Sequence, residues 1–441
     1  MKNIVIGAGP AGRVGSIELG KLKEESILIE KKHVAGTCLN EGCMVICALT
    51  DVARHIEEQK KYQNYGYIKG DIELDYKLLC DKIKETQQKL RYIEQKECED
   101  LGIEVIFGEA EINGDMVSVN GESFQYKNLM ISTGAKPFIP NIKGSEYGYV
   151  HSDLLNFKEI PPKVNIVGGG MIACEIGNIL STFGSEVNIF ARSTFLKELD
   201  PSIKDYVVNN LLKNIKVYEN TCVSEITKNT LISDKGEFEG ISFICTGRVP
   251  NSDIAKDIVD INPDGSIKVD EQMRTNVSNI YAAGDVTGGN MFTPVARTEG
   301  ITAARNMAGF SQKVDIKYIP ESISLNMPVS FVKRNSNSET ETIQIPGFAG
   351  PGAFWNVLNG DTGTTKIDIN KEDKKVENVY SISPSSVNDV AYMTMLMSLN
   401  MDKDAFKNFL EIHPDSAAVS IMMKYMIQKK YYLLKMKILK T

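Results

Sequence analysis

Asn3-Ile4-Val5-Ile6-Gly7-Ala8-Gly9-Pro10-Ala11-Gly12, close to the N-terminus, is a β-branched run that leads into a glycine-rich turn. A helical pattern to about Lys23 follows, and then the apolar run Ile27-Leu28-Ile29-Glu30. These are the parts of a βαβ unit in a parallel sheet. Glycine lets the backbone approach a pyrophosphate, whose charge the helix N-terminus stabilises. The sequence therefore predicts a dinucleotide-binding unit.

Glu30 supports this prediction, because it ends the second strand 23 positions after Gly7. A carboxylate at this place can accept hydrogen bonds from ribose hydroxyls. The alternative is a tight turn that binds no ligand. The candidate binding residues of the unit are Gly7, Gly9, Pro10, Ala11 and Glu30.

The same pattern returns in Val164-Asn165-Ile166-Val167-Gly168-Gly169-Gly170-Met171-Ile172-Ala173. A helix to about Phe183 and the strand Val187-Asn188-Ile189-Phe190 follow it. We therefore expect an α/β fold with two Rossmann-like dinucleotide-binding domains. The candidate binding residues of this second unit are Gly168, Gly170 and Ile172.

The second unit lacks the carboxylate of the first, since position 23 after Gly168 is Ala191. Arg192 follows, and Lys197 comes five residues later. A carboxylate would repel a 2′-phosphate, whereas cations attract it. The pattern favours NADP over NAD as the ligand; the alternative is that Arg192 is an ordinary surface cation.

Composition divides the rest of the chain into segments. Residues 48–98 have helical spacing and many charges, residues 103–135 alternate as short strands, and the composition shifts near Pro320. The last 18 residues contain six lysines and no acid, which predicts a basic amphipathic helix at a surface or subunit contact, with membrane binding as the weaker alternative. The expected domains are 1–150, 151–270, a return segment of the first at 271–320, and a C-terminal domain at 321–441.

Length and charge exclude some classes of protein. The chain has 441 residues, 42% hydrophobic and 24% charged, with a formal net charge of −7. This length predicts about three domains, and the negative charge argues against nucleic-acid binding. No run approaches the roughly 18 apolar residues of a membrane span. We expect a soluble, cytoplasmic protein.

Two cysteines separated by four residues lie in Gly36-Thr37-Cys38-Leu39-Asn40-Glu41-Gly42-Cys43. The segment follows the Glu30 strand, which places it near the reactive end of a bound dinucleotide. A helix that begins at Cys43 would lower the pKa of its thiol. Inert thiols and a zinc site are the alternatives; a zinc site would need two more ligands, and of the four histidines in the chain only His33 and His55 are nearby. The sequence predicts a redox pair and no metal.

Two later motifs are weak when taken alone. Ala283-Gly284-Asp285 ends a short apolar strand, and its carboxylate can bind a polyol hydroxyl, although Gly-Asp by itself indicates only a turn. His413-Pro414 offers a histidine near the C-terminus, and a lone histidine seldom indicates catalysis.

Together these residues resemble the class I pyridine nucleotide-disulfide oxidoreductases, the family of dihydrolipoamide dehydrogenase, glutathione reductase and mercuric reductase. The likeness runs from Met1 to about Pro414. The motifs that carry it, in the family's order, are Gly7 to Gly12, Gly36 to Cys43, Ser132-Thr133-Gly134, Gly168 to Glu175, Thr246 to Asn251, Ala283-Gly284-Asp285 and His413-Pro414.

The resemblance implies an FAD-dependent NAD(P)H:disulfide oxidoreductase. FAD would lie in the first domain, with Glu30 at its adenosine ribose and Asp285 at its ribityl chain. NAD(P)H would lie in the second, and a C-terminal α+β domain would form a homodimer. The segment Phe190 to Leu196 resembles that of mercuric reductases, which use NADPH. Further cofactor contacts implied by the family are Thr37, Thr133, Gly134, Gly247, Val295 and Ala296.

The resemblance also implies roles for the reactive side chains. Hydride would pass from nicotinamide to flavin N5, and the electrons would then reduce the Cys38–Cys43 disulfide. Cys43 would be the flavin-side thiolate and Cys38 the thiol that exchanges with the substrate. His413 of the partner subunit would be the acid-base group.

Two positions and the C-terminal tail depart from the family. Cys47 replaces a lysine that pairs with the glutamate matched by Glu175, so we expect a lower flavin potential or a protonated Glu175. Cys47 itself could be a resolving thiol, although a small buried apolar residue is the favoured interpretation. Ala418 replaces a glutamate that orients the histidine, which predicts slow turnover of small disulfides. The tail from Asp415 to Thr441 also lacks the cysteine pair of mercuric reductases.

The favoured function is therefore the reduction of a small or protein disulfide, in the manner of dihydrolipoamide dehydrogenase. One alternative is an NAD(P)H oxidase, quinone reductase or mercuric-reductase-like enzyme that uses the thiols only as a relay. Another is a non-catalytic redox sensor. The substrate stays open among lipoamide, a low-molecular-weight thiol such as glutathione or coenzyme A, and a protein disulfide.

Overall fold

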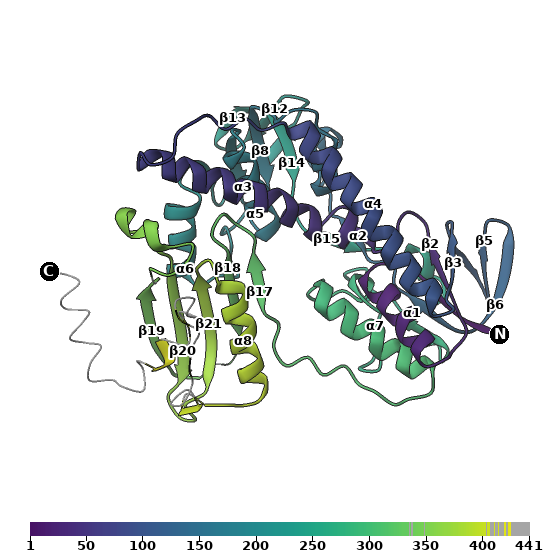
Figure 1. Ribbon diagram of the computed structural model, residues 1–441. Helices are drawn as coiled ribbons and strands as arrows, with labels where there is room; N and C mark the ends of the chain where they lie inside the picture. Colours follow the sequence, from purple (N-terminus) through teal and green to yellow (C-terminus); the bar gives the residue numbers. More distant parts are fainter. Residues whose placement is uncertain are drawn as a thin grey trace.

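The computed structural model describes residues 1–334, 336, 338–347, 349–402, 404, 405, 410, 413, 419 and 422–424. Figure 1 shows an N-terminal domain that contains both α1 and α7, a middle domain around β8 and α5, and a C-terminal domain of strands β17 to β21. A long connection after α7 leads to β17. The two α/β domains and the C-terminal sheet confirm the predicted fold class.

The N-terminal domain is built around β1 (Lys2–Ile6), which is parallel to both β2 (Ser26–Glu30) and β6 (Glu122–Ile131). Helices α1 (Pro10–Lys21) and α7 (Thr293–Met307) pack against each other and share a buried core with this sheet (Figure 1). The return segment thus rejoins the first domain. The remaining strands of this sheet are β3 (Glu104–Phe107), β4 (Glu111–Asn113), β5 (Met116–Val119) and β16 (Ile280–Ala282).

Backbone crowding explains why glycine begins both predicted turns. Gly7 has φ +101°, and a Cβ there would lie 2.4 Å from the carbonyl oxygen of Ser132. Gly168 has φ +139°, and its Cβ would lie 2.1 Å from the carbonyl oxygen of Cys245. Only a residue without a side chain fits both the positive φ and the close approach. The two glycine-rich turns therefore meet the same backbone constraint.

The middle domain has a parallel sheet in the order β10–β9–β8–β14, with α5 (Met171–Thr182) packed against it. A small antiparallel sheet of β11, β12 and β13 adjoins it in sequence. Strands β7 (Ala135–Pro137) and β15 (Arg248–Pro250) pair where the chain enters and leaves this domain. The bounds are β8 (Lys163–Val167), β9 (Glu186–Phe190), α6 (Pro201–Tyr206), β10 (Ile215–Tyr218), β11 (Val223–Ile226), β12 (Thr230–Ser233), β13 (Gly236–Glu239) and β14 (Ile241–Ile244).

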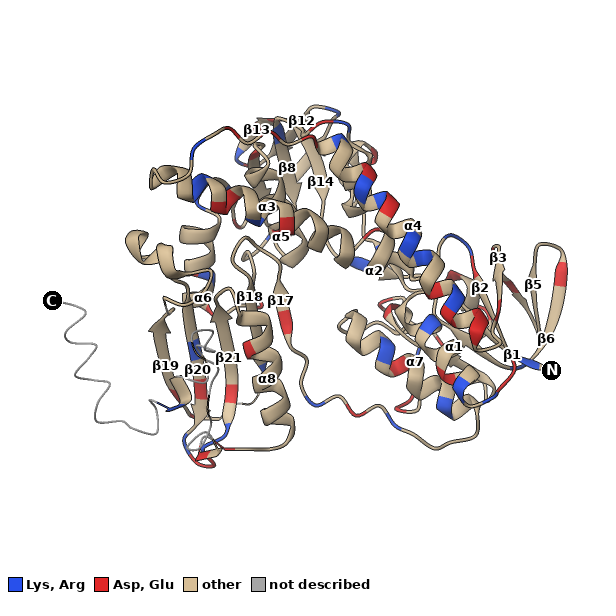
Figure 2. Ribbon diagram, viewed as in Figure 1, with Lys and Arg blue, Asp and Glu red and all other residues tan. Residues whose placement is uncertain are grey.

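The predicted helical excursion consists of two long helices, α3 (Cys43–Asn64) and α4 (Tyr76–Asp100), separated by residues 65–75. The carboxylate of Asp75 accepts a hydrogen bond from the Leu78 backbone N–H, which caps the start of α4. Figure 2 shows residues of both charges along α4, as expected for a solvated helix. One face of α3 instead joins the core that also contains residues of α5.

The C-terminal domain is a five-stranded antiparallel sheet in the order β17–β18–β21–β20–β19, covered by α8 (Ser386–Ser398). Its contacts with the middle domain include the Lys366–Asp200 ion pair at 2.5 Å and the Tyr206–Asp361 hydrogen bond at 2.6 Å. The predicted basic tail lies outside the described residues apart from Lys424. The strands are β17 (Glu321–Ile323), β18 (Val329–Lys333), β19 (Thr340–Pro346), β20 (Thr364–Asn370) and β21 (Val376–Ile382).

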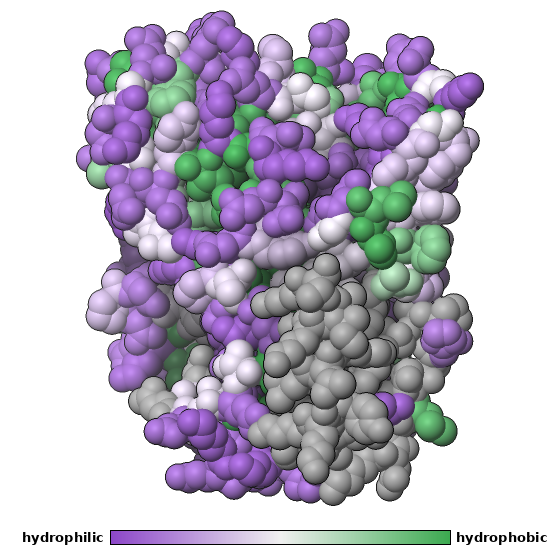
Figure 3. All heavy atoms as spheres, turned by 90° about the vertical axis from the view of Figure 1, so that its left-hand side faces the viewer, coloured by the Kyte–Doolittle hydropathy of each residue, from purple (hydrophilic) through white to green (hydrophobic). Residues whose placement is uncertain are grey.

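The end of α3 also touches the C-terminal domain, at the 3-10 helix η6 (Phe354–Asn359). The Tyr65 hydroxyl donates to the Trp355 carbonyl at 2.9 Å, and the rings of Tyr67 and Trp355 lie 5.1 Å apart. Figure 3, which faces this side of the molecule, shows hydrophobic residues only in separate patches among hydrophilic ones. Within the described part of the chain, no helix is both long enough and apolar enough to cross a membrane.

Candidate active site

The two predicted redox cysteines lie side by side where two helices meet. Cys38 is in the short helix α2 (Gly36–Asn40), and Cys43 is the first residue of α3. Their side chains are hydrogen-bonded to each other, and the Thr293 hydroxyl at the start of α7 also bonds both sulfurs. All eight cysteines of the chain are described, and all are free thiols.

The two thiols have pKa values shifted in opposite directions. The hydrogen bond with Cys43 lowers the pKa of Cys38 to about 6, although burial opposes this shift. The same bond, together with burial, raises the pKa of Cys43 above its usual range. The prediction that the helix N-terminus lowers the pKa of Cys43 is therefore wrong here, because the neighbouring thiol outweighs the backbone. Cys38 is the favoured thiolate, which suits a nucleophile.

The first glycine-rich turn is closed by the predicted carboxylate. Glu30 is 8% exposed and accepts hydrogen bonds of 2.7 Å from the backbone N–H groups of Ala8 and Lys32. Gly9 precedes α1 without a side-chain cap, and Pro10 is the first residue of that helix. A Cβ on Gly9 would meet nothing within 4 Å. The turn therefore presents free backbone N–H groups to open space beside a buried carboxylate, which suits an anion linked to a ribose.

The motif Ser132-Thr133-Gly134 is held against the distant motif Thr246 to Asn251. The Thr133 hydroxyl donates to the Asn251 carbonyl at 2.7 Å, and the Asn251 amide donates back to the Thr133 carbonyl at 3.0 Å. Gly134 and Gly247 both have positive φ with open space where a Cβ would lie. The structure thus brings two predicted cofactor-binding segments together.

Asp285 has a partner that the sequence did not predict. Its carboxylate forms an ion pair of 2.5 Å with Arg248, and both side chains are less than one-fifth exposed. The Arg248 Nε is buried and has no hydrogen-bond partner among the described residues. Glu299 of α7 accepts a hydrogen bond of 2.7 Å from the Gly284 backbone next to Asp285. Asp285 is therefore held at a polar junction of motifs far apart in the sequence. Val295 and Ala296 lie in the first turns of α7, and Thr37 lies in α2.

The second glycine-rich turn lies beside the predicted cations. The Leu196 backbone N–H donates to the Gly169 carbonyl at 2.7 Å, which joins the loop after β9 to the turn. Arg192 and Lys197 are exposed in and next to this loop. The turn keeps Gly170 as the cap of α5, again without a side-chain hydrogen bond, and Ile172 lies in the first turn of that helix. The arrangement suits a dinucleotide phosphate at the turn and a further anion at the loop.

Glu175 is a residue of α5, and its carboxylate accepts a hydrogen bond of 2.7 Å from the backbone N–H of Ser324, just after β17. Burial raises the pKa of Glu175 to about 7, and the nearby Cys43 contributes in the same direction. Cys47 is exposed, so the expectation of a small buried residue there is wrong; partial desolvation and the charges of Cys43 and Glu175 raise its pKa. The raised pKa of Glu175 agrees with the expectation of a protonated Glu175 that followed from Cys47 in place of the family's lysine.

Replacing Glu175 with glutamine is expected to flatten part of the pH dependence of stability. A carboxyl whose pKa rises from 4.5 to about 7 on folding binds a proton in that window, so stability falls as the pH increases from about 4.5 to 7. The expected loss is on the order of 2–3 kcal/mol in the wild type. Urea unfolding at pH 5 and pH 8 measures it.

The substitution Cys47→Lys should also reduce this loss, because a cation would lower the pKa of Glu175. Glu58→Gln, an exposed change on α3, is the matched control and should leave the pH dependence as in the wild type. If the free energy of unfolding changes between pH 5 and pH 8 by the same amount in the wild type and in Glu175→Gln, the pKa of Glu175 is not elevated.

His413 is exposed and belongs to the C-terminal domain, which Figure 1 shows apart from the N-terminal domain that carries α2. Within the described part of this chain, His413 is not among the groups that interact with Cys38 or Cys43. Pro414 and Ala418 lie outside the described residues. One chain alone therefore leaves the histidine away from the thiols.

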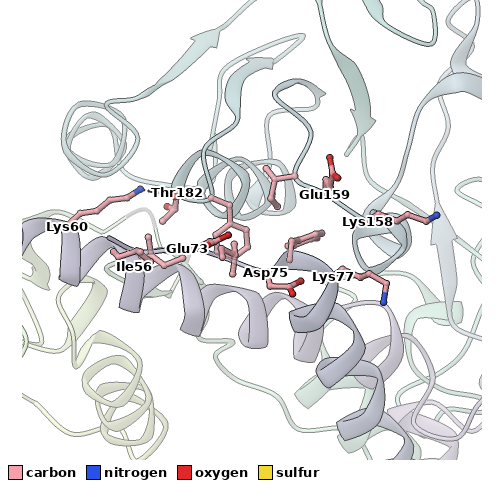
Figure 4. A pocket seen from close by; sticks show the side chains of 13 residues that line it. Ile56, Lys60, Glu73, Asp75, Lys77, Lys158, Glu159 and Thr182 are labelled. Carbon is pink, nitrogen blue, oxygen red and sulfur yellow. Dashed lines mark hydrogen bonds between the residues drawn. The ribbon is translucent and has the colours of Figure 1, made fainter. Parts of the chain in front are cut away.

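A large pocket is remote from the thiols. A pocket of about 690 Å³ lies between α3, the start of α4, and the end of α5 (Figure 4). Ile56, Tyr76 and Phe183 form part of its apolar lining, and Lys158 and Glu159 stand at its rim (Figure 4). Sequence reasoning assigned nothing to this pocket, and neither redox cysteine lines it.

Comparisons with known proteins identify relatives of this chain. The family model described as "Pyridine nucleotide-disulphide oxidoreductase" matches residues 1–300. The uncharacterized protein MJ0636 of Methanocaldococcus jannaschii is 31% identical, covering 94% of this chain and 96% of that protein. Dihydrolipoyl dehydrogenase of Buchnera aphidicola is 28% identical, covering 93% of this chain and 92% of that enzyme.

A solved structure extends the likeness to the whole fold. The Cu(II) complex of RclA, an HOCl-induced flavoprotein disulfide reductase from Escherichia coli, matches with a TM-score of 0.85 and 25% identity, covering 96% of this chain and 99% of the other. The family model covers more than half of the residues, including both glycine-rich turns and the cysteine pair. The chain belongs to the pyridine nucleotide-disulphide oxidoreductase family.

Proposed function

We propose that this chain is an FAD-dependent NADPH:disulfide oxidoreductase that passes electrons to the Cys38–Cys43 pair and then to a disulfide substrate. The observation that carries the proposal is the hydrogen-bonded thiol pair, in which Cys38 has a pKa lowered to about 6. A thiolate with a second thiol in contact is what disulfide exchange requires.

The residues of the N-terminal domain fit FAD. The uncapped N-terminus of α1 at Gly9 would hold its pyrophosphate, and Glu30 would receive its ribose hydroxyls. Asp285 and the unpartnered Nε of Arg248 offer an acceptor and a donor for its polyol chain. When bound, FAD supplies two-electron transfer between a nicotinamide and the disulfide.

The thiol pair would act by two exchanges. The Cys38 thiolate attacks one sulfur of the substrate RSSR, which releases RS⁻ and forms a mixed disulfide. Cys43, once deprotonated, attacks the Cys38 sulfur, which releases the second RS⁻ and forms the Cys38–Cys43 disulfide. The two electrons come from NADPH, so the overall reaction is NADPH + H⁺ + RSSR → NADP⁺ + 2 RSH.

We also propose a homodimer, in which His413 of the partner subunit serves as the acid-base group for Cys38. The exposed position of His413 in its own chain supports this proposal. Gel filtration coupled to light scattering tests the dimer, and a monomer that reduces disulfides at full rate would contradict it.

An anaerobic titration of the purified protein with NADPH and then NADH tests the function. We expect bound flavin to be bleached by NADPH, followed by turnover when disulfides are supplied but little with quinones. A colourless protein that cannot be reconstituted with FAD would refute the proposal. A coloured protein that reduces quinones or oxygen but no disulfide would favour the second candidate, an oxidase or quinone reductase, which the replacement of the family lysine by Cys47 supports.

A further inference from the structure

Arg297 is a cation on the same face of α7 as the threonine that bonds the thiols. Residues four apart in a helix lie on one face, with about 6 Å of rise between them. Thr293 bonds both Cys38 and Cys43, so Arg297 lies one turn further along this face. The charge of Arg297 acts on Cys38 in the direction that favours its thiolate.

The other charged side chains near Cys38 are held in ion pairs. Glu94 of α4 is the acidic group that acts on Cys38, but its carboxylate pairs with Arg13 at 2.9 Å. Arg13 also pairs with Glu97 at 2.7 Å, so this group of one arginine and two glutamates carries a net charge of −1. Arg297 is exposed, and across the described ranges no carboxylate lies within ion-pair distance of it. Of the two described charges that act on Cys38, Arg297 is therefore the one without an ion-pair partner.

Building on the proposed function, we propose that Arg297 is a specificity-determining residue that selects disulfides carrying a carboxylate or another anionic group close to the sulfur atoms. An exposed, unpaired guanidinium can pair with such a group as the substrate approaches. It also stabilises the RS⁻ that leaves when the Cys38 thiolate attacks. A cationic disulfide meets repulsion at the same place.

Three disulfides of similar size test this inference: 3,3′-dithiodipropionate with two negative charges, bis(2-hydroxyethyl) disulfide with none, and cystamine with two positive charges. With the FAD-loaded enzyme and NADPH, we expect kcat/KM to fall in that order. The difference between the anionic and cationic disulfides should be about tenfold or more at low ionic strength, and added salt should reduce it.

Variants of Arg297 separate two effects: selection among disulfides by their charge, and a change in the reactivity of Cys38 toward all of them. Arg297→Lys should keep the order, Arg297→Gln should bring the three kcat/KM values together, and Arg297→Glu should invert them. Lys228→Gln, which removes one exposed positive charge in the middle domain, is the matched control and should behave as wild type. If Arg297→Gln slows all three disulfides by the same factor, the selection is refuted, because Arg297 then acts only through the thiolate.

A second measurement does not depend on turnover. Alkylation of Cys38 by anionic iodoacetate, relative to neutral iodoacetamide, reports the local charge, and mass spectrometry identifies the modified peptide. This ratio should fall several-fold in Arg297→Gln. An unchanged ratio, or equal wild-type kcat/KM for the three disulfides, overturns the inference. If no disulfide is reduced while NADPH still bleaches the flavin, the proposed function itself fails, and the inference fails with it.

Discussion

Replacing Cys38 with serine should abolish disulfide reduction, with a loss of kcat/KM of about 10³-fold or more. A serine hydroxyl remains protonated at neutral pH, so it can neither attack a disulfide nor form the mixed disulfide with the substrate. Cys38 has the lowered pKa of the pair, which makes its thiolate the nucleophile available near neutral pH. Bleaching of the flavin by NADPH should persist, because it precedes the exchange. Stopped-flow absorbance separates the two steps.

The matched control is Cys222→Ser, at an exposed cysteine of the middle domain. It should retain full disulfide reduction and full bleaching by NADPH. Wild-type disulfide reduction by Cys38→Ser would contradict the role of Cys38. Quinone or oxygen reduction that survives in Cys38→Ser, with disulfide reduction absent from the wild type as well, would assign the thiols to a relay or sensor.

The parallel folds of the first two domains were predictable because their signals are local. Gly7 and Gly168 each stand where the backbone has positive φ and a carbonyl lies too close for a side chain. That constraint is met within one short turn and leaves a clear pattern in the sequence. Glu30 likewise lies at a fixed distance from the turn and is buried against it through the Ala8 backbone.

The division of the helical excursion was missed, although a local signal existed. Asp75 is followed by a helical pattern and caps α4 through the Leu78 backbone. The charge density of residues 48–98 hid the break, because the hydrophilic connection and the solvated helices have similar composition. A search for helix caps would have placed the start of α4.

The electrostatics of the site could not be predicted from local patterns. Arg248 meets Asp285 and Thr293 meets Cys38 across long stretches of chain, and no spacing rule connects these pairs. The prediction for Cys43 failed for the same reason. It weighed the helix N-terminus, which is local, but the balance is set by the contact with Cys38 and by burial.

The loop that should select the coenzyme is held firmly by neighbouring elements. The Phe195 backbone N–H donates to the Glu219 carboxylate at 2.6 Å, and Lys204 pairs with the same oxygen at 3.2 Å. The Leu196 backbone N–H bonds Gly169 on the other side. None of these bonds involves the side chain of Arg192 or Lys197, which are both exposed. Both side chains can therefore be replaced without breaking the bonds that hold the loop.

The double substitution Arg192→Glu and Lys197→Glu should therefore lower kcat/KM for NADPH by about 100-fold, since each lost charge-assisted contact to a 2′-phosphate costs roughly a factor of ten. The value for NADH should change little, because NADH has a hydroxyl there. The rate of flavin bleaching, measured over a range of concentrations of each coenzyme, gives kcat/KM for NADPH and for NADH. Lys216→Glu, a charge reversal at an exposed position on β10, is the matched control. Equal losses for NADPH and NADH would show that the substitutions disturb the whole coenzyme site, and a wild type that prefers NADH would show that these cations select no phosphate.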